Sequence, residues 1–176
     1  MQTITRAWGR GMHFGKEANV YVIKLDDGEE VHSTLERLFA QQTIKSGVFL
    51  GGVGMLADLK LGYYDGKDYV TRELSEPHEL VKLSGSTAWV NGKPHLHLHA
   101  AVANKEHQLL GGHLVSAKAH YLNEIYLLRL VDIELTRKKS EKSGLMELII
   151  QKASETKPVL GHVARQRSGS LELDLD

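Results

Sequence analysis

The feature that most constrains this chain is an alternation of imidazole and apolar side chains over six residues, HLHLHA, beginning at His95. In a β-strand successive side chains point to opposite faces. His95, His97 and His99 therefore share one face. Leu96 and Leu98 share the other face, which packs into a core. A helix would spread the same histidines around most of its circumference, so the run predicts a strand.

A second apolar run follows a short polar stretch, and the two runs predict a β-hairpin. A three-residue loop at residues 105–107 fixes a register in which His113 lies directly opposite His99 and on the same face. His97 is then the diagonal neighbour of His113, at roughly 7–8 Å between backbones. A loop of even length would turn His113 to the other face, unless a bulge in the preceding Gly-Gly pair corrected the register.

Three imidazoles that meet on one sheet face predict a metal site. Neutral imidazole suits zinc, copper, iron and nickel, and zinc with three His ligands usually keeps a fourth position for water or substrate. The alternative is a surface strand whose histidines are satisfied by hydrogen bonds. We favour Zn²⁺, or another divalent first-row ion, because clustered histidines without a metal repel one another when protonated and leave ring nitrogens without partners. The predicted ligands, here called the histidine cluster, are His97, His99 and His113.

The run PHLHLHAAVANKEHQLLGGHL, which starts at Pro94, resembles the signature of the PPC (plants and prokaryotes conserved) domain in its stand-alone prokaryotic form. The family pattern is P-x-x-H-x-H followed by G-G-H-L. His95 falls where the family often has an aromatic or apolar residue, so the resemblance does not assign it as a ligand. The resemblance covers roughly residues 8–146. It implies an α+β fold with an antiparallel sheet, a homotrimer, and a metal bound by the histidine cluster.

The remaining pattern predicts an α+β single domain: a largely antiparallel β-sheet with one main flanking helix. The helix is expected over residues 29–44, because Val31, Leu35 and Leu38 share one face, with Asp27 as its cap. Strands are expected at residues 18–25, 47–50, 55–64, 67–73, 79–85 and 123–135, with a tight bend at 51–54 and a connector at 116–120. The expected core comprises Val20, Val22, Leu35, Leu38, Leu96, Leu98, Leu114 and Leu127.

The C-terminal part of the chain reads as an appendage. We assign residues 1–140 to the PPC-like domain and 141–176 to an extension that is not a separate domain. The last six residues, LELDLD, alternate, so we expect them either to add an edge strand or to extend freely from the domain. The basic cluster Arg137-Lys138-Lys139, which closes the domain, reads as an ordinary solvated end, because three charges are too few for a nucleic-acid footprint.

Composition narrows the classes of function. The 22 basic and 22 acidic residues give a net charge of zero, which argues against a protein that holds nucleic acid by charge alone. The absence of cysteine excludes disulfides and thiolate metal sites. The N-terminus lacks the apolar segment of a signal peptide, and no apolar run reaches the length of a membrane span. We therefore expect a cytoplasmic protein with no membrane partner.

Three functions stay open. The first is metal-dependent ligand binding or catalysis, with Glu79 as the candidate acid or base and His95 and Arg72 as weaker candidates. The second is DNA binding: plant proteins with this domain carry AT-hooks, and the nearest match here, Gly9-Arg10-Gly11, lacks the flanking Arg and Pro. The hypothesis of DNA binding thus rests on family analogy alone. The third is a metal that only holds the sheet or the trimer together.

Overall fold

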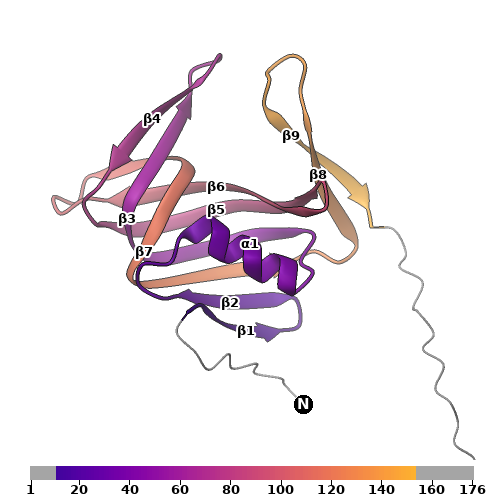
Figure 1. The fold of residues 1–176 in the computed structure, drawn as a ribbon, viewed down its shortest axis with the longest axis horizontal. Coiled ribbons are helices and arrows are strands. Elements are labelled where there is room, and N and C mark those ends of the chain that lie inside the picture. The colour runs from indigo at the N-terminus through magenta and orange to yellow at the C-terminus, as the bar shows by residue number, and fades with distance from the viewer. Residues whose placement is uncertain (1–10, 154–176) are drawn as a thin grey trace, which may run out of the picture.

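A computed structural model describes residues 11–153 (Figure 1). These residues form a single domain, mostly antiparallel β-sheet with one helix. The seven-stranded sheet has the order β1-β2-β7-β6-β5-β3-β4, and β8 and β9 form a separate two-stranded sheet. The elements are β1 (His13–Glu17), β2 (Val20–Leu25), α1 (Val31–Gln41), β3 (Gly47–Tyr64), β4 (Tyr69–Leu74), β5 (His78–Val90), β6 (Lys93–Ala103), β7 (Leu109–Arg129), β8 (Ile133–Lys139) and β9 (Met146–Lys152). Because β3 also pairs with β7, strands β3, β5, β6 and β7 form a closed ring of paired strands.

Helix α1 lies across one face of the sheet, as expected (Figure 1). Its predicted apolar side chains are fully buried, so the face assignment is confirmed. The predicted cap is wrong. The carboxylate of Glu30 accepts the Ser33 backbone N–H at 2.6 Å, whereas Asp27 accepts the backbone N–H of Tyr121 at 2.7 Å and so joins the loop before α1 to β7.

The predicted core is confirmed except on β2. Leu35, Leu38, Leu96, Leu98, Leu114 and Leu127 are buried. On β2 the buried residues are instead Tyr21 and Ile23, while Val20 is half-buried and Val22 is 48% exposed. The physical reason is that this strand is apolar on both faces, so its alternation alone does not say which face α1 covers.

Long strands replace several predicted breaks. The expected tight bend at 51–54 is wrong, because β3 runs through it with register shifts against β7 on both sides of the glycines. The expected connector at 116–120 is likewise part of β7, which pairs with β6 at its start and with β3 and β2 beyond. Tyr121, with φ of +56°, kinks β7 without ending it. The strand predicted at 123–135 therefore divides between β7 and β8, and β1 was not predicted.

The turn predictions hold where glycine defines the turn. Asp65-Gly66 joins β3 to β4, and Asn91-Gly92 joins β5 to β6 with both residues at positive φ, as a type I′ turn requires. Two hairpins project from the same side of the sheet in Figure 1. We call them the β3–β4 arm (residues 59–74) and the β8–β9 arm (residues 133–152). The phenol of Tyr64 at the end of β3 donates to the Ser143 carbonyl at 2.8 Å, which joins the two arms.

Of the predicted extension, residues 141–153 supply the turn of the β8–β9 arm and strand β9. Residues 171–176, for which an edge strand or a free end was expected, lie outside the described residues. Within residues 11–153, no helix combines the length and the apolar character that a membrane crossing needs.

Candidate metal centre

The β6–β7 hairpin positions the three predicted ligands. His99 pairs directly with His113, as the predicted register requires. The loop closes through the Asn104 N–H, which donates to the Gln108 carbonyl at 3.2 Å, and His107 takes the left-handed conformation that ends a three-residue hairpin loop. Alternation along β6 then leaves His97 on the same face as His99. The leucines between them are buried in the core.

The imidazoles of the histidine cluster converge. Their ring centroids lie 5.2, 5.3 and 5.4 Å apart, and each ring offers a nitrogen within 4.8 Å of the other two. Tetrahedral zinc with bonds of about 2.0–2.1 Å requires nitrogens roughly 3.4 Å apart, so modest ring rotations suffice. The buried Nδ1 of His113 has no hydrogen-bond partner. The residues present therefore fit a metal ion.

The surroundings favour the neutral forms of His97 and His113. Burial, followed by the Arg137 guanidinium and the other histidines, lowers the pKa of His97 to about 4. Burial and the neighbouring His99 also lower the pKa of His113. Metal ligands must be neutral imidazoles, so these shifts favour the metal-binding form over a wide pH range.

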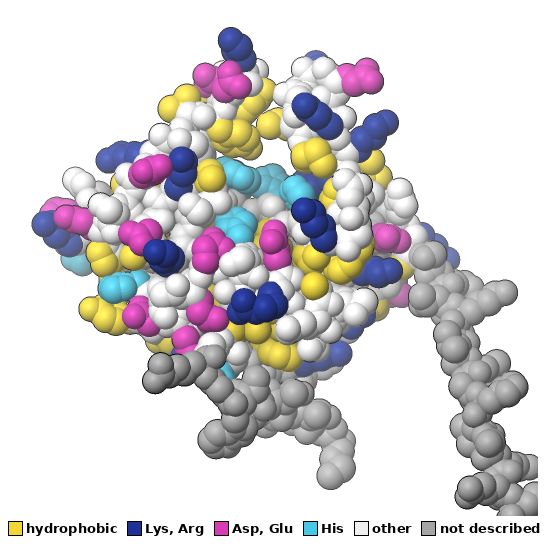
Figure 2. All heavy atoms as spheres, in the orientation of Figure 1, with side chains coloured by type: hydrophobic (Ala, Val, Ile, Leu, Met, Phe, Trp, Pro, Cys, Tyr) yellow, Lys and Arg dark blue, Asp and Glu magenta, His cyan; other side chains and the backbone are white. Residues whose placement is uncertain are grey.

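Two members of the cluster, His97 and His113, line a hollow of about 800 Å³, here called the histidine pocket. Figure 2 shows histidine side chains gathered between the two projecting arms. Tyr69 of the β3–β4 arm contacts His113, with ring centroids 5.1 Å apart. His32 of α1 also lines the pocket, and burial lowers its pKa. The opposite wall comes from the β8–β9 arm, with Leu145, Met146 and Leu148.

Arg137 was missed as a pocket residue. The prediction of a solvated basic end is wrong for it, because Arg137 is only 8% exposed and lines the histidine pocket, although Lys138 and Lys139 are exposed. Its Nη2 donates to Ser86 Oγ at 2.9 Å and its Nη1 donates to the Met146 carbonyl at 3.2 Å. The available signal was alternation along β8, which places Arg137 on the same side as buried Leu135.

The predicted catalytic candidates lie at different distances from the cluster. His95 lines the pocket, and burial followed by Arg137 lowers its pKa. Glu79 is exposed and pairs with Ala103, four residues along β6 from His99, or roughly 13 Å at about 3.3 Å per residue. Arg72 lines a different hollow, beside Glu76 and the β6–β7 loop. A role for Glu79 or Arg72 stays a prediction.

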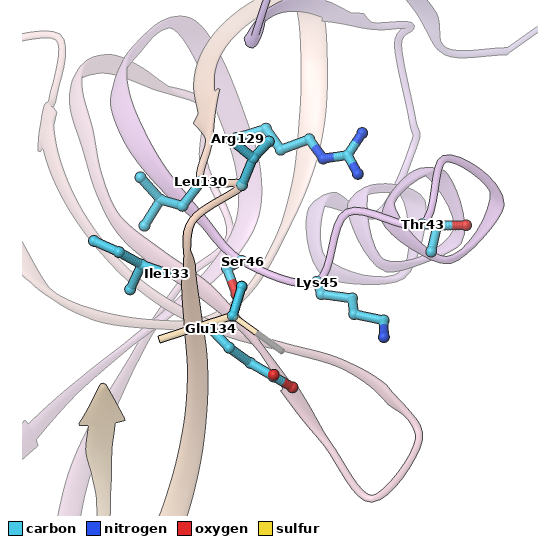
Figure 3. Close-up of a pocket in the computed structure, with 9 residues that line it drawn as sticks. Thr43, Lys45, Ser46, Arg129, Leu130, Ile133 and Glu134 are labelled. Carbon is cyan, nitrogen blue, oxygen red and sulfur yellow. The ribbon is translucent and has the colours of Figure 1, made fainter. Parts of the chain in front are cut away.

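A separate hollow of about 330 Å³ lies beside the turn from β7 to β8 (Figure 3). Lys45 and Arg129 extend to one side of it, away from Leu130 and Ile133. Ser46, which lines this hollow, has a structural role, because its Oγ accepts the Leu135 backbone N–H at 2.8 Å. None of its lining residues is a histidine.

Comparison with known proteins identifies similar sequences and folds. The sequence model of the Plants and Prokaryotes Conserved (PCC) domain matches residues 12–131. The chain is 34% identical over 141 residues to the bifunctional protein GlmU of Synechococcus sp. (strain JA-3-3Ab). That match covers 79% of this chain and 22% of the relative, so the chain spans about a fifth of that protein's length.

Two solved structures share the fold. A metal-containing protein from Archaeoglobus fulgidus has a TM-score of 0.70 and 27% identity, with 80% of this chain and 99% of that chain covered. A protein from Ralstonia eutropha JMP134, provisionally described as DNA-binding, has a TM-score of 0.72 and 27% identity, with 78% and 96% covered.

Proposed function

This chain belongs to the Plants and Prokaryotes Conserved domain family, and on that premise we propose that it is a metal-binding protein whose histidine cluster presents a divalent ion to a small-molecule ligand. Zn²⁺, or another divalent first-row ion, suits a set of three neutral imidazoles. The observation that carries the proposal is the convergence of three ring nitrogens within 4.8 Å, where two of the three histidines, His97 and His113, line a pocket. The similarity to a metal-containing protein from Archaeoglobus fulgidus supports it.

Within this site the chain supplies rigid ligands and a partly enclosed space. His99 and His113 are held by adjacent paired strands, and His97 lies on the same strand face. A bound divalent ion would supply a Lewis acid at the cluster. Tyr69 and the β8–β9 arm line the space beside the cluster. A fourth protein ligand to the ion would favour a purely structural role instead.

The deciding experiment is elemental analysis of purified protein, with wild type compared to His99→Ala. We expect about one zinc per chain in the wild type and near zero in His99→Ala, because His99 lies directly across from His113. His95→Ala is the matched control and should keep its metal. A zinc content near zero in the wild type, after metal supplementation at neutral pH, would contradict the proposed metal site.

We also propose that the chain forms a homotrimer, as the resemblance implies. A row of apolar residues on the sheet face opposite α1 supports association. Val20, Leu128 and Val48 lie side by side across β2, β7 and β3, and Val48 is 39% exposed. An apolar face of this kind marks a contact with another chain. Light scattering at micromolar concentration should give a trimer, and a monomer would remove the proposal.

DNA binding is the second candidate function, and the likeness to the Ralstonia eutropha protein favours it. The balance of 22 basic and 22 acidic residues weighs against it. We expect no sequence-specific binding by this chain alone. A gel shift that survives near physiological ionic strength, with a steep dependence on salt, would favour DNA over a small ligand.

A further inference from the structure

We propose that the histidine pocket binds a small monocarboxylate with an apolar body, whose carboxylate lies between the histidine cluster and Arg137 and whose body lies against the β8–β9 arm. The contact with a metal ion rests on the proposed function. The contact with Arg137 and the apolar wall rests on side chains that the structure already places. The pocket would therefore select its ligand by charge at one end and by apolar contact at the other.

The first support is an arginine whose charge is buried without an acidic partner. Arg137 is 8% exposed, and within residues 11–153 it forms no ion pair with a carboxylate. Its two recorded hydrogen bonds go to a hydroxyl and a carbonyl, and its buried Nε has no partner. A buried guanidinium held only by neutral groups is incompletely compensated. A ligand carboxylate supplies the missing negative charge, and its planar form suits the arginine fork.

The second support is the location of that charge. Arg137 lines the same pocket as His97 and His113, and it is the leading charged group acting on His97. One acidic side chain, Glu147, also lines the pocket, but it is exposed and accepts a hydrogen bond from the Ser143 hydroxyl at 3.2 Å. Of the residues that line the pocket, Arg137 carries the one buried charge and Glu147 is exposed; Glu30, which does not line the pocket, lies 3.7 Å from His32. An anion is favoured beside Arg137.

The third support is the composition of the walls. Val115, Leu145, Met146 and Leu148 line the pocket. Met146 and Leu148 are 37% and 42% exposed, so the arm presents apolar surface to the hollow. A volume of about 800 Å³ is typical of a small-molecule site and exceeds what a bare inorganic anion fills. These walls favour an aliphatic or aromatic acid over phosphate or sulfate.

The test uses hexanoate and its neutral analogue 1-hexanol, titrated by ligand-observed NMR into the full chain loaded with zinc at pH 7. We expect saturable binding of hexanoate and much weaker binding of 1-hexanol. Arg137→Gln should weaken hexanoate about tenfold or more, because a charge-assisted pair is lost, without a change in zinc per chain. Arg129→Gln, an arginine beside the other hollow, is the matched control and should bind as the wild type does.

A second variant keeps the test decisive if Arg137→Gln does not fold. Leu148→Glu changes an exposed position on the apolar wall and places a carboxylate against the body of the ligand. It should weaken hexanoate to a similar extent. Equal affinities for hexanoate and 1-hexanol, or unchanged hexanoate affinity in folded Arg137→Gln, would overturn the inference. A chain that binds no zinc but binds hexanoate through Arg137 would overturn the proposed function and leave the carboxylate contact standing.

Discussion

The β6–β7 hairpin and the β8–β9 arm form opposite walls of one pocket, but they are held in place by different means. The hairpin lies within the part of the chain that matches the family, and its apolar face is buried in the core. The arm lies beyond residue 131, and most of β9 is exposed. Its hold on the sheet includes polar contacts, from Leu135 to Ser46 and from Arg137 to Ser86. The half of the pocket that carries the histidine cluster is thus fixed by the core, and the other half by a few directional bonds.

The largest expected effect on stability comes from alanine substitutions at two glycines, one beside the hairpin and one in the arm. Gly85 pairs with Leu98 beneath the hairpin at φ of +139°, and a Cβ there would overlap the His97 carbonyl oxygen. Gly144 in the turn of the arm has φ of +72° and open space around it. Gly85→Ala should cost about 2–6 kcal/mol in the free energy of unfolding, and Gly144→Ala only about 1–2 kcal/mol. Urea denaturation of both variants measures this, and equal losses would contradict the contrast.

The next effect concerns the link between the two regions. Ser86→Ala removes the hydroxyl that accepts Arg137 Nη2 and leaves a buried cationic donor without that partner. We expect a loss of about 1–3 kcal/mol in the free energy of unfolding. Hydrogen exchange should show β8 and β9 less protected while β6 keeps its protection. A uniform loss across both regions would mean that the arm and the hairpin unfold as one unit.

A smaller effect is the dependence of the free energy of unfolding on pH. It distinguishes the two regions because the arm contains no histidine. Burial holds the pKa of His97 at about 4 and lowers those of His95 and His113 below their usual 6.5. Between those values the unfolded chain takes up protons that the folded metal-free chain does not. The contribution of these histidines to the free energy of unfolding is therefore fully present above about pH 6.5. It is lost as the pH falls toward 4.

Because these rings are partly exposed, screening reduces that decline to on the order of 1 kcal/mol between pH 7 and pH 5. Denaturation in the presence of a chelator measures it. His97→Gln should flatten the dependence on pH, whereas Ser86→Ala should lower stability equally at both pH values. A wild-type chain as stable at pH 5 as at pH 7 would contradict the lowered pKa values of His95, His97 and His113.

The smallest effect concerns the bond over the pocket between the two arms. Tyr64→Phe removes the hydroxyl that donates to the Ser143 carbonyl at 2.8 Å. Because Tyr64 is only half-buried, the loss should be about 0.5–1 kcal/mol. The turn of the β8–β9 arm should exchange its amide hydrogens faster, and zinc content should not change. Tyr63→Phe, whose phenol is 74% exposed, is the matched control.

The same division explains what could be predicted from the sequence. The hairpin register follows from a loop of three residues and a period of two, so the pairing of His99 with His113 was predicted and is confirmed. The helix face was predicted because its apolar residues repeat at helical spacing. Both rest on relations between residues close together in the chain.

The failures share another cause. Val22 was predicted to be buried because β2 is apolar on both faces, and only the position of α1 decides which face enters the core. The continuity of β3 and β7 depends on bulges that form between distant strands. Arg137 was taken as solvated because its partner Ser86 lies 51 residues away in the sequence. Long-range packing determines each of these three features, so the local sequence pattern does not predict them.

The closeness in sequence of the proposed metal ligands has a consequence for the order in which the molecule assembles. Short loops close quickly, whereas contacts between distant segments pay a larger entropy of closure and form late. The β6–β7 hairpin needs only its own turn to bring His99 against His113. Pairing of β2 with β7, and docking of Arg137 on β5, require segments far apart in the chain to meet. An ion that binds during folding would therefore meet its ligands while the arm that completes the pocket is still undocked, so the metal would be acquired before the ligand site exists.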